Sequence, residues 1–507
     1  MEMPLVDWIG KWAVYRPDKL AVKEYETGKG YTYAQLDQLA NGLLSYFQTQ
    51  LGIQAGDRIA IIAQNCAEYF LLFSVAQKGG MTLVPLNYRL AKAELTHLLQ
   101  DAKVSLLISE ETYFEDISQI VEALGIAHHL HIAELETWAK YESHEPPKMA
   151  SFQPDDPIFI LYTSGTTGLP KGVLYTHRML FWNSVNTAMS LVVNTESRTV
   201  NCMPPFHTGG WNVLTTPFLH RGGYTCLLKK FDPELVLRAI AEEQATIFMG
   251  VPTMLKMMAD SSLFDQTDTS RLLYMIVGGE AMPIPLIERW HKKGVPIRQG
   301  YGMTEVGPNL TSLHQDDAVR KAGSIGRANY YVQYRIVDES GQDVAAGTSG
   351  ELWLHGPNVT PGYWRQPTAI EQAKVDGWFR TGDLVQEDEQ GYLYVVDRIK
   401  NMFISGGENI YPAEIERVLL SHPDIAEAAV IGLPDAQWGE VGCACIVLTE
   451  DAELSTQQVT DYCRSKLAKF KVPKHFRFSQ GLPKSDTGKI DRKGLRARLL
   501  LNQKGST

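Results

Sequence analysis

Ten consecutive residues, 163–172, combine glycine, hydroxyl and lysine side chains in a pattern that suits phosphate binding. The stretch reads TSGTTGLPKG and follows the apolar run 158–162, which predicts a strand that ends at a loop. Glycines let a backbone turn tightly and present N–H groups, hydroxyls add donors, and a lysine adds positive charge. The residues concerned are Thr163, Ser164, Gly165, Thr166, Thr167, Gly168 and Lys171. We therefore predict a loop that binds a polyphosphate.

Two common nucleotide-binding motifs do not fit this chain. A Walker loop needs G-x-x-x-x-G-K-[ST], but Pro170 precedes the lysine and Gly172 follows it. A G-x-G-x-x-G fingerprint fails as well, because the glycines of Gly300-Tyr301-Gly302 are followed by Glu305 at the last position. These mismatches argue against P-loop kinases and against dinucleotide-binding enzymes.

Short apolar strands alternate with amphipathic helices through about residue 320, which predicts an α/β architecture with mostly parallel sheets. After that point the strands shorten and glycines separate them, which predicts a smaller β-rich unit. From about residue 400 the pattern returns to mixed α and β, and we place a boundary near Asp397–Asn401. The predicted strands are 59–63, 82–85, 104–108, 158–162, 245–249, 273–277, 334–338, 351–355, 392–396, 427–431 and 444–448, and the predicted helices are 33–48, 233–244, 284–293 and 412–420.

Composition limits the class of protein further. Six cysteines without a C-x-x-C pair predict reduced thiols in a cytoplasmic protein. No apolar run reaches the roughly 18 to 20 residues that a membrane span needs, and the N-terminus lacks the order of a signal peptide. A net charge of −10 argues against nucleic acid as the main partner. Residues 464–507 nevertheless carry thirteen basic residues against two acidic ones, which suits phosphorylated small molecules or a solvated basic face.

The sequence TSGTTGLPKG resembles the signature loop of the adenylate-forming superfamily of acyl- and aryl-CoA synthetases, luciferases and peptide-synthetase adenylation domains. Further motifs of that superfamily occur in its order between about residues 31 and 492. The resemblance implies an N-terminal domain, residues 1–397, with two α/β-layered subdomains and a small β-rich subdomain. It also implies a hinge at 398–401, with Lys400 at its centre, and a small mobile α+β C-terminal domain at 402–507.

Two motifs with this resemblance would surround the adenine and the phosphates. In YGMTE, residues 301–305, Tyr301 would stack on adenine, Thr304 would contact a phosphate oxygen, and Glu305 would bind Mg²⁺ together with Thr163. In GGE, residues 278–280, the backbone would line the adenine pocket. The further residues assigned to ATP and AMP in these motifs are Gly278, Gly279, Glu280, Gly302 and Met303.

Two more motifs would complete the nucleotide site. Asp383, in GWFRTGDL, would accept from the ribose hydroxyls, with Arg398 as a second ribose contact. Lys489, in PKSDTGKI, would enter the site during adenylation and bridge the substrate carboxylate and the α-phosphate.

The resemblance places the acyl pocket around PPFHTGGWN, where His207 would be a gate that moves between the two half-reactions. The thiol tunnel would be lined by the segment that contains Ser405, Gly406 and Gly407. The residues assigned to the acyl pocket are Phe206, His207, Trp211, Val251, Gly302, Met303, Val306 and Gly307.

These motifs imply an ATP-dependent carboxylic acid:CoA ligase that works through an acyl-AMP intermediate. No acidic residue stands in PPFHTGGWN to hold a substrate amine, which argues against amino-acid activation. The largely apolar pocket suits a fatty or aromatic acid. The stretches RKAGSIGRA and SGGENIYPAEIE most resemble bacterial fatty acyl-CoA synthetases, and this resemblance implies a medium- or long-chain fatty acid. The alternatives are an aryl or arylpropenoate acid, and an adenylating enzyme with a carrier-protein acceptor. A non-catalytic adenylate-binding protein fits less well, because Lys171, Glu305 and Lys489 are all present.

The expected ligands are therefore ATP, Mg²⁺, CoA and a small carboxylic acid. We expect no nucleic-acid partner and no membrane span, while peripheral contact with a bilayer stays open. A monomer or a homodimer in the cytoplasm is consistent with the sequence.

Overall fold

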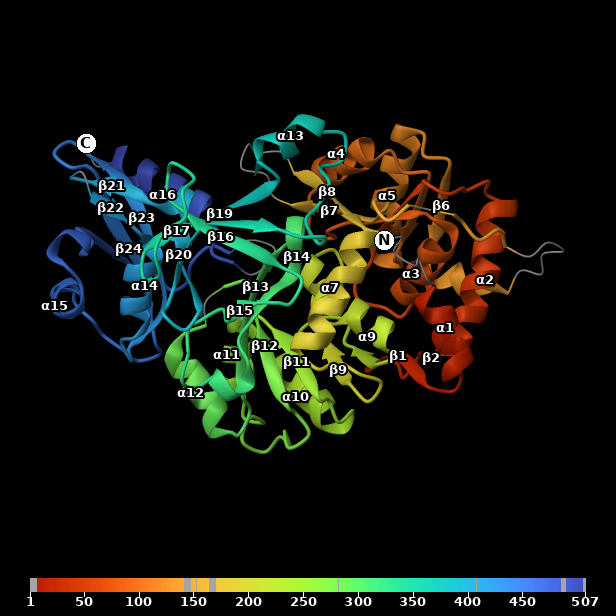
Figure 1. Cartoon of the computed structure of the whole chain (residues 1–507), viewed down its shortest axis with the longest axis horizontal. Helices are drawn as coiled ribbons and strands as arrows, with labels where there is room; N and C mark the ends of the chain where they lie inside the picture. Colours follow the sequence, from red (N-terminus) through yellow and green to blue (C-terminus); the bar gives the residue numbers. More distant parts are fainter. Residues whose placement is uncertain are drawn as a thin grey trace.

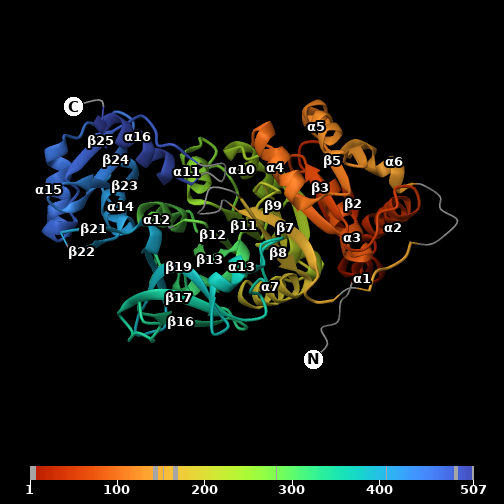
Figure 2. The ribbon, with the colours of Figure 1, turned by 90° about the horizontal axis from the view of Figure 1, so that it is seen from above.

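The computed structural model describes residues 7–140, 147–151, 153–163, 170–280, 282–406, 408–484 and 489–504. In both views the residues up to about 140 form one end of an elongated molecule and those after about 400 form the other (Figures 1 and 2). The strands that carry most of the predicted site residues lie between these ends.

A six-stranded sheet lies at the centre of the first part, in the order β6-β5-β3-β4-β7-β8. All neighbours are parallel except β7 and β8, which form an antiparallel hairpin around the predicted phosphate loop. One face packs on α2 and α3, the other on α4 and α5. The strands are β3 (Arg58–Ile62), β4 (Thr82–Pro85), β5 (Leu106–Ser109), β6 (His128–His131), β7 (Pro157–Thr163) and β8 (Lys171–Thr176).

Two further sheets complete the layered part of the N-terminal domain. Parallel β11, β12 and β13 continue into antiparallel β14 and β15, and a separate sheet has the order β2-β1-β10-β9. Their bounds are β1 (Leu20–Glu24), β2 (Gly30–Thr32), β9 (Arg198–Asn201), β10 (Tyr224–Leu227), β11 (Ile247–Gly250), β12 (Tyr274–Val277), β13 (Ile297–Met303), β14 (Gly307–Ser312) and β15 (Arg327–Ala328).

An antiparallel sheet follows and forms the β-rich unit, in the order β16-β17-β19-β18 with β20 beside β19. These strands are β16 (Gln333–Val337), β17 (Ser349–His355), β18 (Lys374–Val375), β19 (Trp378–Glu387) and β20 (Leu393–Arg398). After β20 the chain makes one 3-10 turn, Ile399–Asn401, and enters the C-terminal domain.

The C-terminal domain is a sheet packed on helices. Its strands are β21 (Phe403–Ser405), β22 (Glu408–Ile410), β23 (Ile425–Asp435), β24 (Gly439–Leu448) and β25 (His475–Phe478). Leu495 and Leu499 of α16 cover one face of β23 and β24, while residues of α14 and α15 pack on the other. The domain therefore has a core of its own.

Local signals in the sequence explain many helix ends. Thr32 and Gln35 form a capping box at the start of α2, and Asp232 caps α10 ahead of Pro233. The helices are α1 (Trp8–Tyr15), α2 (Tyr33–Thr49), α3 (Glu68–Gly79), α4 (Lys92–Ala102), α5 (Glu111–Leu124), α6 (Leu135–Ala139), α7 (His177–Ser190), α8 (Thr208–Asn212), α9 (Thr215–Arg221), α10 (Pro233–Glu242), α11 (Pro252–Asp260), α12 (Ile284–Lys292), α13 (Pro367–Gln372), α14 (Pro412–Leu420), α15 (Thr456–Lys466) and α16 (Arg492–Lys504).

The predicted fold class is confirmed: a large α/β N-terminal domain with a β-rich unit precedes a small α+β domain. Each predicted strand and helix overlaps an observed one of the same type, although β23 and β24 are longer than predicted. The predicted hinge at 398–401 coincides with the end of β20 and the 3-10 turn, while motion about it stays a prediction. Within the described residues, no helix combines the length and apolar character needed to cross a bilayer.

Candidate active site

The phosphate-loop hairpin presents Thr163 and Lys171 opposite each other at the end of the central sheet. The two residues are paired across β7 and β8, and the Thr163 hydroxyl donates to the Lys171 carbonyl over 3.4 Å. Five predicted phosphate contacts, Ser164 to Gly168, lie outside the described residues. The strands that carry this loop are fixed, because β7 is buried on both faces of the sheet.

A tight turn between β13 and β14 places Thr304 and Glu305. A side chain at Gly302 would collide with the backbone of Pro308, and Gly307 has a φ of 83°, so both positions need glycine. The Glu305 carbonyl accepts from Thr360 N at 2.7 Å, and the Glu305 carboxylate accepts from the Tyr363 hydroxyl at 3.3 Å. Desolvation raises the pKa of Glu305, so this carboxylate lies in a site with little water.

Tyr301, Asp383 and Arg398 form a hydrogen-bonded cluster where the ribose contacts are predicted. The Tyr301 hydroxyl donates to one oxygen of Asp383 at 2.5 Å, and Arg398 Nε donates to the other at 2.9 Å. Asp383 and Arg398 are register partners on β19 and β20, which fixes their approach. The buried Asp383 carboxylate therefore stays paired, and each of its oxygens can accept one more donor.

Lys489 of the C-terminal domain reaches the N-terminal domain at the GGE motif. A methyl group built on Gly279 would lie 3.6 Å from Lys489 Cε and 3.8 Å from Val251 Cγ1. Desolvation lowers the pKa of Lys489, and the nearby Arg398 charge lowers it further, whereas Glu280 and Asp383 oppose the shift. The structure thus brings Lys489, Glu280, Asp383 and Arg398 to one place.

The segment behind Lys489 is anchored within its own domain. Arg492, at the start of α16, donates to both oxygens of Glu416 at 2.6 Å, and Asp491 N donates to Pro483 O at 2.8 Å. Bidentate pairing of this kind fixes orientation as well as position. The Glu416–Arg492 pair cannot be predicted from the sequence, because the partners stand 76 residues apart and match no motif.

His207 lies beside this cluster in its neutral form. It is the N-cap residue of α8, and its side chain makes the cap: Nδ1 accepts from Gly209 N at 3.0 Å. Desolvation lowers the pKa of His207 to about 4, with a further contribution from the charge of Lys489. A neutral imidazole does not add positive charge near Lys489. It is also consistent with the prediction that His207 moves between the two half-reactions.

Three of the predicted acyl-pocket residues are packed into cores. Trp211 is 2% exposed, and its ring centroid lies 5.1 Å from Phe159 and 5.8 Å from Phe73. Phe206 packs edge-on against Tyr88, and Val306 belongs to the core of the β-rich unit. Their contact with the acid stays a prediction.

Three predicted residues lie close to other parts of the site. Val251 faces Gly279 and Lys489, and a side chain at Gly307 would meet the Asn183 amide oxygen at 3.1 Å. Met303, at the end of β13, packs against the core of the β-rich unit.

The predicted thiol-tunnel segment is held within the C-terminal domain. Ser405 pairs with Gly439, and Gly406 N donates to Trp438 O at 2.8 Å. Gly407 lies outside the described residues, and Lys400 is exposed. Tunnel formation therefore stays a prediction that depends on a second position of the domain.

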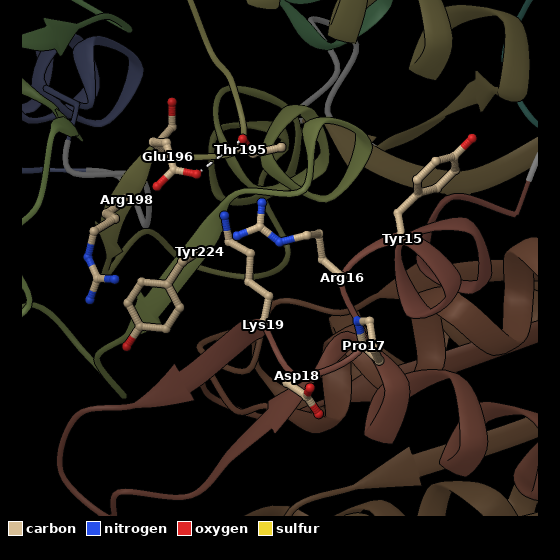
Figure 3. A pocket seen from close by; sticks show the side chains of 10 residues that line it. Tyr15, Arg16, Pro17, Asp18, Lys19, Thr195, Glu196, Arg198 and Tyr224 are labelled. Atoms are coloured by element: carbon tan, nitrogen blue, oxygen red, sulfur yellow. Dashed lines mark hydrogen bonds between the residues drawn. The ribbon is translucent and has the colours of Figure 1, made fainter.

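A recess of about 500 Å³ lies apart from this site, between the turn after α1 and the start of β9. Figure 3 shows Arg16 and Lys19 side by side within it, with Arg198 and Tyr224 on the facing strands and Asp18 turned away. None of the predicted site residues lines it.

Comparison with known proteins agrees with the motifs. The family model for the AMP-binding enzyme matches residues 10–364, and that for the AMP-binding enzyme C-terminal domain matches residues 414–489. The chain therefore belongs to the AMP-binding, adenylate-forming enzymes. Within that class it is an AMP-forming acyl-CoA synthetase, as its relatives are named CoA ligases and synthetases.

Three curated relatives are each 37% identical to this chain. They are feruloyl-CoA synthase from Amycolatopsis sp (95% of this chain, 97% of the relative), indoleacetate–CoA ligase from Aromatoleum aromaticum (97% and 98%) and a long-chain-fatty-acid–CoA ligase from Mycobacterium tuberculosis (94% and 95%).

Among solved structures, an anthranilate CoA ligase with anthranoyl-AMP superposes with a TM-score of 0.90 at 28% identity, covering 98% of both chains. The o-succinylbenzoate synthetase of Bacillus subtilis with ATP and magnesium gives 0.84 at 31% identity, covering 96% and 99%.

We expect Trp211→Ala to destabilise the fold by about 3 to 5 kcal/mol, because it empties the middle of an aromatic cluster. The free energy of unfolding from denaturant titrations measures this. Tyr330→Ala is the control, since Tyr330 is 72% exposed. An unchanged free energy of unfolding in Trp211→Ala would contradict the packed position of this indole.

We expect wild-type protein to lose stability relative to His207→Asn as the pH falls from about 7 to 5. The pKa of His207 is lowered to about 4, so between that value and the unfolded value the unfolded chain binds more protons. Stability therefore rises with pH across this window. Denaturant titrations at both pH values measure the difference, with His97→Asn, at an exposed position, as the control. Parallel curves for wild type and His207→Asn would show that His207 titrates normally.

Proposed function

We propose that this synthetase activates a compact aromatic carboxylic acid. The observation that supports this is the position of Trp211, whose indole is enclosed by Phe159, Phe73, Phe70 and Tyr69. A long alkyl chain on that side of the predicted acyl pocket would need space that these aromatic side chains now fill, so the side chains would have to move. An acid with a short, planar body does not need such a change.

Polar groups behind Gly307 support the same proposal. The Asn183 oxygen faces Gly307, and Asn183 Nδ2 donates to Asn212 O at 2.6 Å. Asn309 Nδ2 donates to Val213 O at 3.0 Å. The amide nitrogens are thus paired with backbone carbonyls, and the Asn183 oxygen is the polar atom next to Gly307. An amide oxygen suits a ring that carries a hydrogen-bond donor better than a methylene chain, which satisfies no polar group. Relatives named for feruloyl-CoA and indoleacetate are consistent with this choice.

A medium- or long-chain fatty acid is the second candidate. The relative named as a long-chain-fatty-acid ligase shares the same identity with this chain, and several predicted pocket residues are apolar. A fatty acid would need the Trp211 side chain to change its rotamer. This requirement separates the two candidates experimentally.

We propose that adenylation proceeds with the domains arranged as they are here. A carboxylate oxygen of the acid bonds to the α-phosphorus of ATP, the bond from that phosphorus to the bridging oxygen breaks, and pyrophosphate leaves. Lys489 offsets the repulsion between the two anions, while Thr163 and Lys171 hold the phosphates. Tyr301 and the Asp383–Arg398 pair hold the adenosine.

The residues present fit a magnesium ion at Glu305. Mg²⁺ is usually held by one or two carboxylates together with substrate phosphates, and the described residues contain no cluster of three or more His, Cys, Asp or Glu that could hold an ion alone. When bound, the ion would neutralise charge that develops on the phosphate oxygens. Glu305, with Thr163 nearby on the hairpin, supplies a carboxylate and a hydroxyl for it.

In the second half-reaction the CoA thiol attacks the acyl carbon, and AMP leaves. Lys489 lies next to Gly279, where we propose that the CoA thiol approaches the acyl carbon. We therefore propose that the C-terminal domain first rotates about 398–401. Ser405 and Gly406 would then replace Lys489 at the site.

A panel of acids with ATP, Mg²⁺ and CoA tests the substrate. We expect ferulate-like and indoleacetate-like acids to give acyl-CoA, AMP and pyrophosphate with kcat/KM at least about tenfold above that for octanoate or palmitate. Mass spectrometry of the products measures this. Faster turnover of palmitate would favour the second candidate, and acyl-AMP without thioester would indicate a different acceptor.

Lys489→Ala is expected to slow acyl-AMP formation by roughly 100-fold or more, because an electrostatic contact in the transition state is lost. Thioester formation from supplied acyl-AMP should change by less than about threefold, since the lysine has left the site by then. Rapid-quench assays of each half-reaction measure the two rates. Lys484→Ala is a matched control, because it removes an exposed charge in the same segment, where Lys484 pairs with Glu427. Equal losses in both half-reactions would contradict the two-position mechanism.

A further inference from the structure

Tyr363 contacts both a predicted phosphate-binding residue and the predicted metal ligand. The Lys171 ammonium lies 5.3 Å from the centroid of the Tyr363 ring, and the Tyr363 hydroxyl donates to Glu305 at 3.3 Å. The first is a cation–π contact with the ring, and the second is a hydrogen bond to a carboxylate. One side chain therefore touches two groups of opposite charge.

We propose that Tyr363 is a positioning residue that holds Lys171 and Glu305 apart and aims each at its own ligand. The proposal rests on the roles proposed above for Lys171 and Glu305. Within the part of the chain that the structure describes, Lys171 has no carboxylate within 4.0 Å: its ammonium lies over the Tyr363 ring, while Glu305 contacts the hydroxyl of that ring. A direct ion pair would neutralise both side chains, so the ring keeps the lysine for phosphate and the carboxylate for a cation.

The backbone around Tyr363 is fixed to the elements that carry both partners. Tyr363 bridges Val173 on β8, and Trp364 N donates to Gly172 O at 2.7 Å. On the other side, Thr360 N donates to Glu305 O at 2.7 Å, and the Thr360 hydroxyl donates to Leu174 O at 2.7 Å. The segment 360–364 thus joins the phosphate-loop hairpin to the turn at 304–306.

The two contacts have separate chemical effects. The hydrogen bond from the Tyr363 hydroxyl restricts the orientation of the Glu305 carboxylate. The ring attracts the Lys171 ammonium and limits its rotamers. Loss of the hydroxyl should therefore affect the metal, and loss of the ring should affect ATP.

Two substitutions separate these effects in the full-length enzyme. Tyr363→Phe keeps the ring and removes the hydroxyl, so we expect the Mg²⁺ concentration for half-maximal adenylation to rise roughly fivefold to tenfold, with the KM for ATP at saturating Mg²⁺ unchanged. Tyr363→Leu removes both contacts, so the KM for ATP should also rise roughly threefold. Pyrophosphate exchange at varied Mg²⁺ and ATP measures both values.

Tyr334→Phe is the matched control, because it removes a tyrosine hydroxyl that donates at 2.7 Å to Glu387, a carboxylate that is not a predicted site residue. It should leave both values unchanged. The double variant Tyr363→Phe/Glu305→Gln tests whether Tyr363 acts on the metal through Glu305. In that case Tyr363→Phe should add nothing to the Mg²⁺ shift of Glu305→Gln alone.

The outcomes distinguish this inference from the proposed function. A Mg²⁺ shift in Glu305→Gln without one in Tyr363→Phe would overturn the role of Tyr363 and leave the metal assignment standing. No shift in either variant would overturn both. If Tyr363→Leu does not fold, Tyr363→Phe still tests the contact between the hydroxyl and Glu305, since it preserves the shape of the side chain.

Discussion

Repulsion between two anions is the constraint on which the arrangement of this enzyme depends. A carboxylate and a phosphate 4 Å apart repel by about 4 kcal/mol at an effective dielectric constant near 20, and more strongly where water is excluded. In the proposed mechanism, two lysines on different domains would offset this repulsion: Lys171 lies on β8 of the central sheet, and Lys489 belongs to the C-terminal domain and lies beside Gly279. A charge carried on a second domain can be withdrawn when the reaction no longer needs it.

The paired and unpaired groups of the site follow from the same constraint. Asp383 is held by Tyr301 and Arg398, so its burial is compensated. Lys489 has no carboxylate within 4.0 Å in the described chain, and desolvation together with the nearby Arg398 charge lowers its pKa. In the proposed mechanism, the anionic substrates would supply the missing negative charge. A fully paired lysine would hold the domain closed whether or not substrate was bound.

The sequence predicts those parts of the fold that depend on local patterns. Strand 82–85 and helix 412–420 match their observed bounds, because apolar β-branched runs and a proline start are local signals. Tyr363 escapes prediction, because its contacts with Lys171 and Glu305 depend on how β8 and the turn after β13 pack together. The aromatic surroundings of Trp211 also escape prediction, because they depend on how α3 packs against β7; its contact with the acid stays a prediction.

The joint between the domains is held by hydrogen bonds to a single carboxylate, that of Asp397. One oxygen of Asp397 accepts from Arg398 N and from Asn401 Nδ2 within the 398–401 turn, and the other accepts from Ala413 N at the start of α14. Rotation about this turn can keep the first two bonds, but it must strain or break the third. In the proposed mechanism, loss of the bond from Ala413 N would therefore accompany rotation of the C-terminal domain. The same rotation would withdraw Lys489 from Gly279, which is what two successive half-reactions at one site would require.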